Sequence, residues 1–197
     1  TFSEPVTISD SDITFTCERT GAVAFTGAAS TTDPNTWLLT PEAELAGLQT
    51  CTITIPADKV LDNDTEDPPD GLSEDLVLTF SPAEGCGDPY TEVNQIQGPG
   101  ASIPAAYLNK IVSVEGIVVA DLQAKGNKRA FYIHSINPDE DPLSSEGLMI
   151  YTGTKPVAGM NPGDHVRIRG KAVEYSGVSE ISPYETVWKC SAGNDYA

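Results

Sequence analysis

The chain has 197 residues, of which 39% are hydrophobic and 20% are charged, a composition typical of folded domains rather than disordered chains. Its net charge is −18 at pH 7, and residues 1–85 hold 16 acidic side chains against 2 basic ones. The first half should therefore repel nucleic acids and anionic membranes. No stretch reaches about 18 consecutive apolar residues, so we expect no membrane span. Thr1 opens directly into a strand-like segment, so we expect a mature or trimmed chain without an export signal.

The first 81 residues show a pattern of short strands. These segments are β-branched or aromatic, and several alternate with polar residues. Turn-rich clusters separate them at the spacing typical of a sandwich. We predict strands at residues 6–8, 13–17, 23–25, 36–39, 51–55 and 76–80.

A second set of strands follows the turn and breaker residues of 81–85, which predict a linker. The expected strands are 111–119, 130–134, 147–151, 165–173, and 178–181 with 186–188. Five strands with glycines at bend positions indicate a small, coiled barrel. We therefore predict an all-β chain with a sandwich at 1–81, a linker and lead-in at 82–100, a barrel at 101–190 and a tail at 191–197.

The four cysteines have no Cys-x-x-Cys spacing, which favours disulfides over a zinc or redox site. Of the three possible pairings, Cys17–Cys51 with Cys86–Cys190 keeps each bridge inside one predicted domain. The alternative is four buried thiols in a cytosolic protein.

The first domain resembles bacterial Ig-like domains of secreted and surface proteins, which implies an Ig-like β-sandwich and an extracellular, bacterial location. The motifs that carry this resemblance lie at 1–6, 39–41, 45–47, 50–56 and 60–64.

The second domain resembles the OB-fold domain of bacterial extracellular nucleases. Its motifs lie at 86–91, 96–98, 114–118, 131–133, 146–151, 162–170 and 174–177. In such nucleases an Ig-like and an OB-fold domain precede a catalytic domain of the endonuclease/exonuclease/phosphatase superfamily. The resemblance therefore implies a catalytic domain after Ala197, and a non-catalytic role for the present chain.

Basic and aromatic side chains of the second domain are the candidate nucleic-acid contacts. Alternation in the strand around Val166 places three cations on the face opposite the apolar residues, where they suit phosphate contacts. In OB-folds the ligand face lies on strands two and three with the adjoining loops, where aromatic rings stack with bases. The predicted set is Lys125, Lys128, Arg129, Tyr132, His134, Tyr151, Arg167, Arg169 and Lys171. The alternative is an ordinary solvated barrel wall.

The acidic run between Ala57 and Gly71 is a candidate calcium site, because calcium takes six to eight oxygen ligands. Its predicted ligands are Asp62, Asp64, Asp67 and Asp70, although EF-hand spacing is absent. The alternative is a solvated loop.

No nucleophile elbow, zinc-protease motif or phosphate loop occurs, so we expect no enzyme active site in this chain. We predict a monomeric, secreted region that holds single- or double-stranded DNA, or RNA, for a downstream catalytic domain. The first alternative is a carbohydrate-binding or adhesion module, and the second is a structural spacer.

Overall fold

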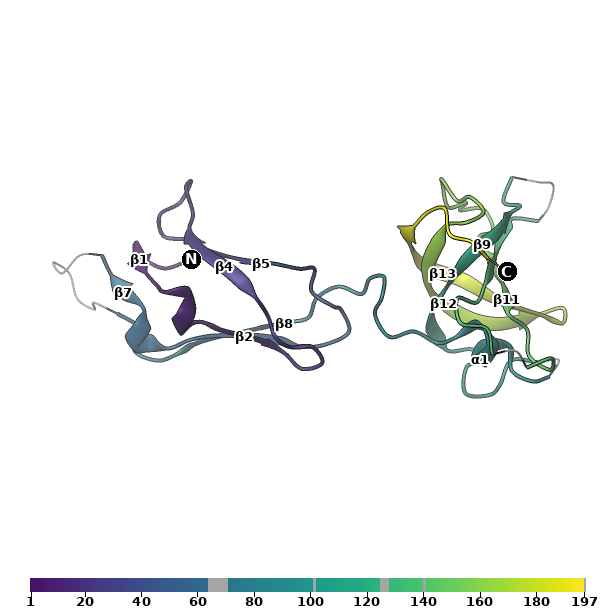
Figure 1. The fold of residues 1–197 in the computed structure, drawn as a ribbon, viewed down its shortest axis with the longest axis horizontal. Helices are drawn as coiled ribbons and strands as arrows, with labels where there is room; N and C mark the ends of the chain where they lie inside the picture. The colour runs from purple at the N-terminus through teal and green to yellow at the C-terminus, as the bar shows by residue number, and fades with distance from the viewer. Residues whose placement is uncertain (64–70, 101, 125–127, 140, 197) are drawn as a thin grey trace. The chain divides into compact units, whose positions relative to one another are not determined.

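The computed structural model describes all residues except 64–70, 101, 125–127, 140 and 197 (Figure 1). The chain divides into two units, Thr1–Glu84 and Gly85–Ala197. The fold is all-β and comprises a sandwich followed by a closed five-stranded barrel, which confirms the predicted fold class. None of the helices in the described part of the chain has the length and apolarity that a membrane crossing requires.

The N-terminal unit is built from short strands in separate sheets. One sheet has the order β3-β2-β6-β8, and two-stranded sheets are formed by β4 with β5 and by β1 with β7. Single turns of 3-10 helix occupy Asp10–Asp12 and Ala57–Lys59. The strands are β1 (Val6–Thr7), β2 (Thr14–Cys17), β3 (Gly21–Ala22), β4 (Phe25–Ala29), β5 (Trp37–Pro41), β6 (Cys51–Ile55), β7 (Leu61–Asp62) and β8 (Leu76–Phe80).

The core of the N-terminal unit consists of two small clusters between the four-stranded sheet and β4–β5. One cluster centres on Ile13 and Ile55, with partly buried Trp37 from β5 packed against it. The other contains Phe15 and the disulfide between Cys17 and Cys51, which join neighbouring strands. Little apolar area is removed from water here, so the disulfide supplies part of the stability.

The second unit is a barrel in which the strands follow the order β10-β11-β13-β12-β9. All neighbouring pairs are antiparallel except β11 with β13, which pair in parallel. The strands are β9 (Ile111–Asp121), β10 (Ala130–His134), β11 (Gly147–Tyr151), β12 (His165–Tyr175) and β13 (Val178–Ser191). The two segments expected at 178–181 and 186–188 thus form one continuous strand.

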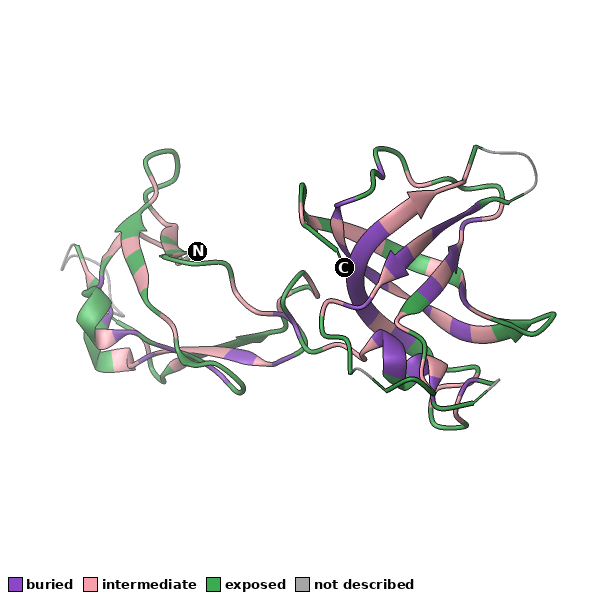
Figure 2. Ribbon diagram, turned by 45° about the vertical axis from the view of Figure 1, so that its right-hand side comes forward, coloured by how far each residue is buried: buried purple, intermediate pink, exposed green. Residues whose placement is uncertain are grey.

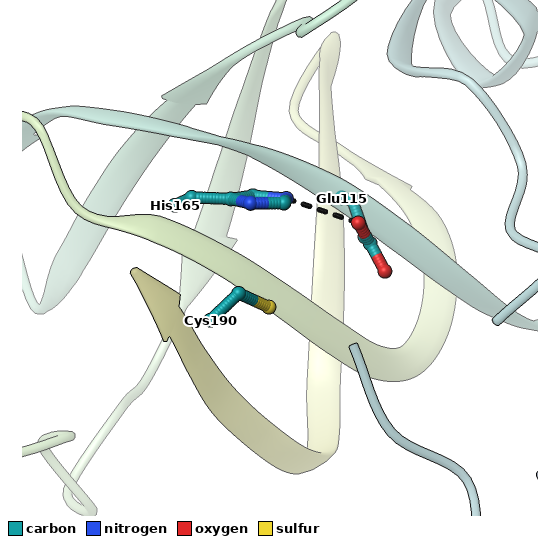
Figure 3. Close-up of side chains that lie close together, drawn as sticks. All are labelled: Glu115, His165 and Cys190. Atoms are coloured by element: carbon teal, nitrogen blue, oxygen red, sulfur yellow. Dashed lines mark hydrogen bonds and ion pairs between the residues drawn. The ribbon is translucent and has the colours of Figure 1, made fainter. Parts of the chain in front are cut away.

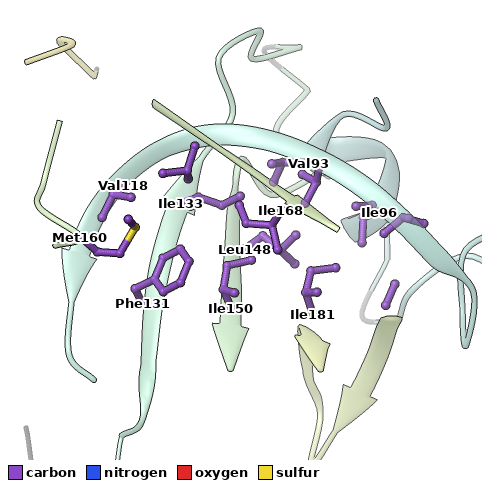
Figure 4. Close-up of a cluster of buried hydrophobic side chains, with 14 of the residues drawn as sticks. Val93, Ile96, Val118, Phe131, Ile133, Leu148, Ile150, Met160, Ile168 and Ile181 are labelled. Atoms are coloured by element: carbon purple, nitrogen blue, oxygen red, sulfur yellow. The ribbon is translucent and has the colours of Figure 1, made fainter. Parts of the chain in front are cut away.

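One continuous core fills the barrel (Figure 4). Each strand contributes side chains to it, and in β10 and β11 these alternate along the strand, as with Phe131 and Ile133 of β10. The short helix α1 (Val93–Gln97) adds Val93 and Ile96, both fully buried. Buried residues line the barrel strands, whereas intermediate and exposed residues predominate in the N-terminal unit (Figure 2).

At Gly170, strand β12 lies close against β13. A Cβ atom at this position would lie 2.4 Å from the Ile181 side chain and 2.9 Å from the Pro183 carbonyl oxygen. The register of β12 against β13 shifts at the same residue. Glycine therefore permits the close approach of the two strands at this register shift.

Candidate nucleic-acid interface

Arg167 lies inside the protein and cannot contact a ligand, which corrects its predicted role. Its side chain is fully buried on β12. Nη1 donates to the carbonyl oxygen of Asp88 and to Oε1 of Glu115, each at 2.7 Å, and Nη2 donates to the carbonyl oxygen of Pro89 at 2.8 Å. Alternation did turn Arg167 away from the barrel core, but residues 86–91 pass over this outer face and cover it.

The predicted row of three cations on β12 is therefore not a phosphate-binding row. Nε of Arg169 donates to Oε2 of Glu185 at 2.8 Å, so a carboxylate of β13 neutralises this guanidinium. Lys171 lies half-buried beside Ile111 of β9. The barrel order places one strand between β12 and each of β10 and β11, so these side chains lie on a different wall from the predicted aromatic contacts.

The outer face of β10 and β11 carries the predicted aromatic residues. Tyr132 is half-buried and pairs with Met149, while Tyr151 pairs with Ala130 at the end of β10. Their neighbours Phe131 and Ile150 are fully buried, so Tyr132 and Tyr151 point away from the core. The structure brings these two tyrosines together on one face, as predicted.

His134 lies at the opposite end of β10 from Ala130. Its Nδ1 lies 2.9 Å from the Ser135 carbonyl oxygen, so this nitrogen carries the proton and donates. The ring lines a separate pocket of about 370 Å³ together with Ile117 and Tyr196. His134 therefore shares a strand with Tyr132 but faces a different hollow.

Two loops bring cations to the Tyr151 end of this face. Lys128 and Arg129 are exposed just before β10, and Lys155 is exposed in the loop after β11. The Arg129 carbonyl oxygen accepts hydrogen bonds from the Thr152 backbone N–H at 2.8 Å and the Thr152 hydroxyl at 2.9 Å. These bonds hold the loops together, so the three cations gather at one end of the barrel. Lys125 lies outside the described residues.

A pocket of about 260 Å³ opens at the same end. Tyr151 and Lys155 line it together with Ser182 and Tyr184 of β13. The Tyr184 hydroxyl donates to the Lys155 carbonyl oxygen at 2.7 Å, which fixes the loop that carries the lysine. Two tyrosines and one lysine thus border this hollow.

An acidic side chain lies on the same wall. Glu180 of β13 pairs with Met149 and is 5% exposed. Burial raises the pKa of its carboxyl group, and a hydrogen bond from Ser182 opposes part of that rise. The carboxyl group therefore takes up a proton more readily than an exposed one, which reduces its repulsion of anions.

Comparison with known families bears on the N-terminal unit. Residues 1–82 match a family model described as a bacterial Ig-like domain. The N-terminal unit is an Ig-like domain. No curated protein and no solved structure matches the chain. The match ends before the barrel begins, so the barrel is interpreted from its own geometry.

The acidic run of the Ig-like domain remains an untested calcium prediction. Asp62 ends β7, where it pairs with Val6, and its side chain lies near a pocket of about 460 Å³ that Phe2 and Leu72 also line. The other predicted ligands, Asp64, Asp67 and Asp70, lie outside the described residues.

A second cluster, Glu115 with His165 and Cys190, has the residue types of a metal site (Figure 3). The sulfur of Cys190 is bonded to Cys86, however, so it is no thiolate ligand. Glu115 accepts from Arg167 and from His165 Nε2, the latter at 2.9 Å. The cluster therefore joins residues 86–91 to the barrel as a structural network.

Sequence reasoning missed Met149, Lys155, Glu180 and Tyr184. Lys155 and Tyr184 come from a loop and a strand 29 residues apart, and only the parallel pairing of β11 with β13 brings them together. Alternation in Gly147–Tyr151 could have identified Met149, because it places Met149 on the face of Tyr151.

Proposed function

We propose that this chain is a non-catalytic region of a bacterial secreted or surface protein, and that its barrel binds single-stranded nucleic acid along β10 and β11. The observation that carries the proposal is that Tyr132 and Tyr151 share one outer face of the barrel, with Lys155 in the pocket beside Tyr151 and the exposed Lys128 and Arg129 immediately before β10. Rings on which bases stack, bordered by cations that contact phosphates, are the usual elements of single-strand recognition.

The barrel topology supports this use of the face. Its strands follow one another around the barrel as first, second, third, fifth and fourth, the order of an OB-fold. OB-folds bind oligonucleotides and oligosaccharides on strands two and three, which are β10 and β11 here. The acidic Ig-like domain would repel the same ligand and serve as a spacer. The two disulfides support an extracellular location.

We further propose that the parent protein is an extracellular nuclease whose catalytic domain follows this region. The barrel motifs resembling those of such nucleases support this placement. Binding by the barrel would raise the local concentration of substrate for the catalytic domain.

Fluorescence anisotropy with a labelled single-stranded oligonucleotide tests the binding proposal at two salt concentrations. Replacing Lys128, Arg129 and Lys155 together with alanine should weaken binding by about tenfold or more and reduce the salt slope by about 2, since each lost phosphate contact removes about 0.7. Tyr132→Ala should cost about 1–3 kcal/mol through lost stacking. The matched control is Arg169→Ala with Lys171→Ala, which should leave both quantities unchanged. Equal weakening by both sets, or no binding by the parent chain, would refute the proposal.

A neutral oligosaccharide is the second candidate, because Ser182 and Tyr184 add polar groups to the pocket that Tyr151 lines. Sugar binding should be nearly independent of salt, whereas binding through phosphate contacts should weaken steeply as salt rises. The salt dependence therefore separates the two ligands.

A further inference from the structure

Strand β8 is an uncharged strand at the edge of the four-stranded sheet of the Ig-like domain (Figure 1). It pairs with β6 from Leu76 to Phe80, and among the described residues no other strand pairs with it. An edge strand leaves a row of backbone N–H and C=O groups open to another strand.

The apolar core continues outward onto β8. Leu76, Leu78 and Phe80 pair with the core-facing residues Ile55, Ile53 and Cys51 of β6, so they share the inner face of the sheet. Phe80 packs edge-on against the buried Phe15, with ring centroids 6.0 Å apart. Yet Leu78 is 48% exposed and Phe80 is 38% exposed, so this end of the core is incompletely covered.

Other sheet edges of the domain carry the usual protection. β3 has two residues, and β5 ends at Pro41. On β4, the backbone N–H of Gly27 donates to Oδ2 of Asp10 at 2.8 Å, so a side chain occupies that edge. β8 itself contains no proline and no charged residue.

The charge around β8 indicates what kind of strand it accepts. Glu74 and Asp75 are exposed immediately before it, in a half of the chain that holds 16 acidic residues and 2 basic ones. A second copy would bring the same carboxylates and be repelled. We propose that β8 is a docking edge for an extended, lysine- or arginine-flanked apolar segment of a partner protein, which adds a strand to the sheet and covers Leu78 and Phe80. Backbone hydrogen bonds and alternate side chains provide affinity and specificity in this mode of recognition.

The probe is a fluorescent peptide of alternating valine and threonine with two lysines at each end, titrated into the full chain at low salt. A glutamate-flanked peptide of the same core should bind at least about tenfold more weakly, because like charges repel. Leu78→Lys should reduce binding of the lysine-flanked peptide by a similar factor. The control Leu38→Lys changes a leucine with 52% exposure on β5 and should leave binding unchanged.

Hydrogen exchange provides a readout that needs no variant, since bound peptide should protect the backbone amides of β8. The proposal is overturned if the two peptides bind equally, if both leucine variants weaken binding alike, or if the parent chain binds neither peptide. Sedimentation showing that the chain alone dimerises, and that Leu78→Lys abolishes the dimer, would overturn it in favour of a second copy.

Discussion

The barrel closes its sheet on itself, whereas the Ig-like domain leaves its sheets with open edges. Closure lets every barrel strand face one shared core, from Val114 on β9 to Ile181 on β13. The Ig-like domain divides its buried side chains between two clusters, and Leu78 at the end of the core remains half exposed. The two β-domains of this chain thus differ in how much apolar area stabilises them.

The two units also differ in how they use charge. The barrel buries Arg167 against Glu115 and closes residues 86–91 over both. The Ig-like domain buries none of the carboxylate residues among its described positions and ties two neighbouring strands with a disulfide instead. The barrel should therefore be sensitive to loss of this internal charge pair, and the Ig-like domain to loss of its covalent bond.

Replacing Arg167 with methionine should cost about 3–5 kcal/mol of barrel stability, because it leaves Glu115 buried without its charged partner. Guanidinium unfolding measures this through Trp188 fluorescence in a Trp37→Phe background, so that the barrel is observed alone. Adding Glu115→Gln should recover part of the loss, since a neutral amide costs less to bury than a carboxylate.

Arg169→Met is the matched control for that experiment. Its partner Glu185 is exposed, and the pair should contribute no more than about 1 kcal/mol. Equal losses of stability in the two variants would mean that the buried pair stabilises the barrel no more than the exposed pair does.

Much of this architecture is predictable from local pattern. The bounds predicted for β6, β8, β10 and β11 agree with the structure, because short runs of β-branched, aromatic and other apolar residues between turn-rich segments indicate strands directly. The five-residue helix α1 was missed because it is too short to show a helical period. Its N-cap is Glu92, which is outside the residue types that usually signal a helix start.

The burial of Arg167 shows where local pattern fails. Alternation states which face of β12 the side chain occupies, but the carbonyl groups that cover that face belong to Asp88 and Pro89, nearly 80 residues earlier. The same limit applies to the pocket of Tyr151 and Tyr184, which depends on a parallel pairing of distant strands. Whether a predicted cation is exposed to a ligand therefore depends on segments that are distant in the sequence.

Replacing Cys17 and Cys51 with alanine should cost the Ig-like domain about 3–4 kcal/mol, since the bridge spans 34 residues and restricts the unfolded chain. Domains are stable by only about 5–15 kcal/mol, so a domain with small core clusters should lose most of its stability. Thermal unfolding followed by Trp37 fluorescence in a Trp188→Phe background measures the change.

The matched variant replaces Cys86 and Cys190, which are 104 residues apart. Chain entropy predicts a loss of about 5 kcal/mol for that loop, yet the barrel core should keep the domain folded. If the barrel unfolded and the Ig-like domain did not, the contrast drawn between their cores would be wrong.

The smallest effect concerns one buried carboxylate of the barrel and is revealed by pH. Asp164 is 2% exposed; burial raises its pKa, but the hydrogen bonds from Lys189 Nζ and the Asn161 backbone N–H, each 2.8 Å long, outweigh burial and hold the pKa below the ordinary value of 3.8. A lowered folded-state pKa stabilises the barrel above about pH 4, and this stabilisation is lost as the pH falls through that lower value. Asp164→Asn should therefore cost about 1–2 kcal/mol at neutral pH, and the stabilities of the variant and the parent should become equal in strong acid.

The exposed Asp33 of the Ig-like domain provides the control. Hydrogen bonds from Thr36 and Asn35 also lower its pKa, but solvent screens the carboxylate, so Asp33→Asn should change stability less. A constant difference between Asp164→Asn and the parent across the acid range would show that packing, not charge, holds Asp164 in place.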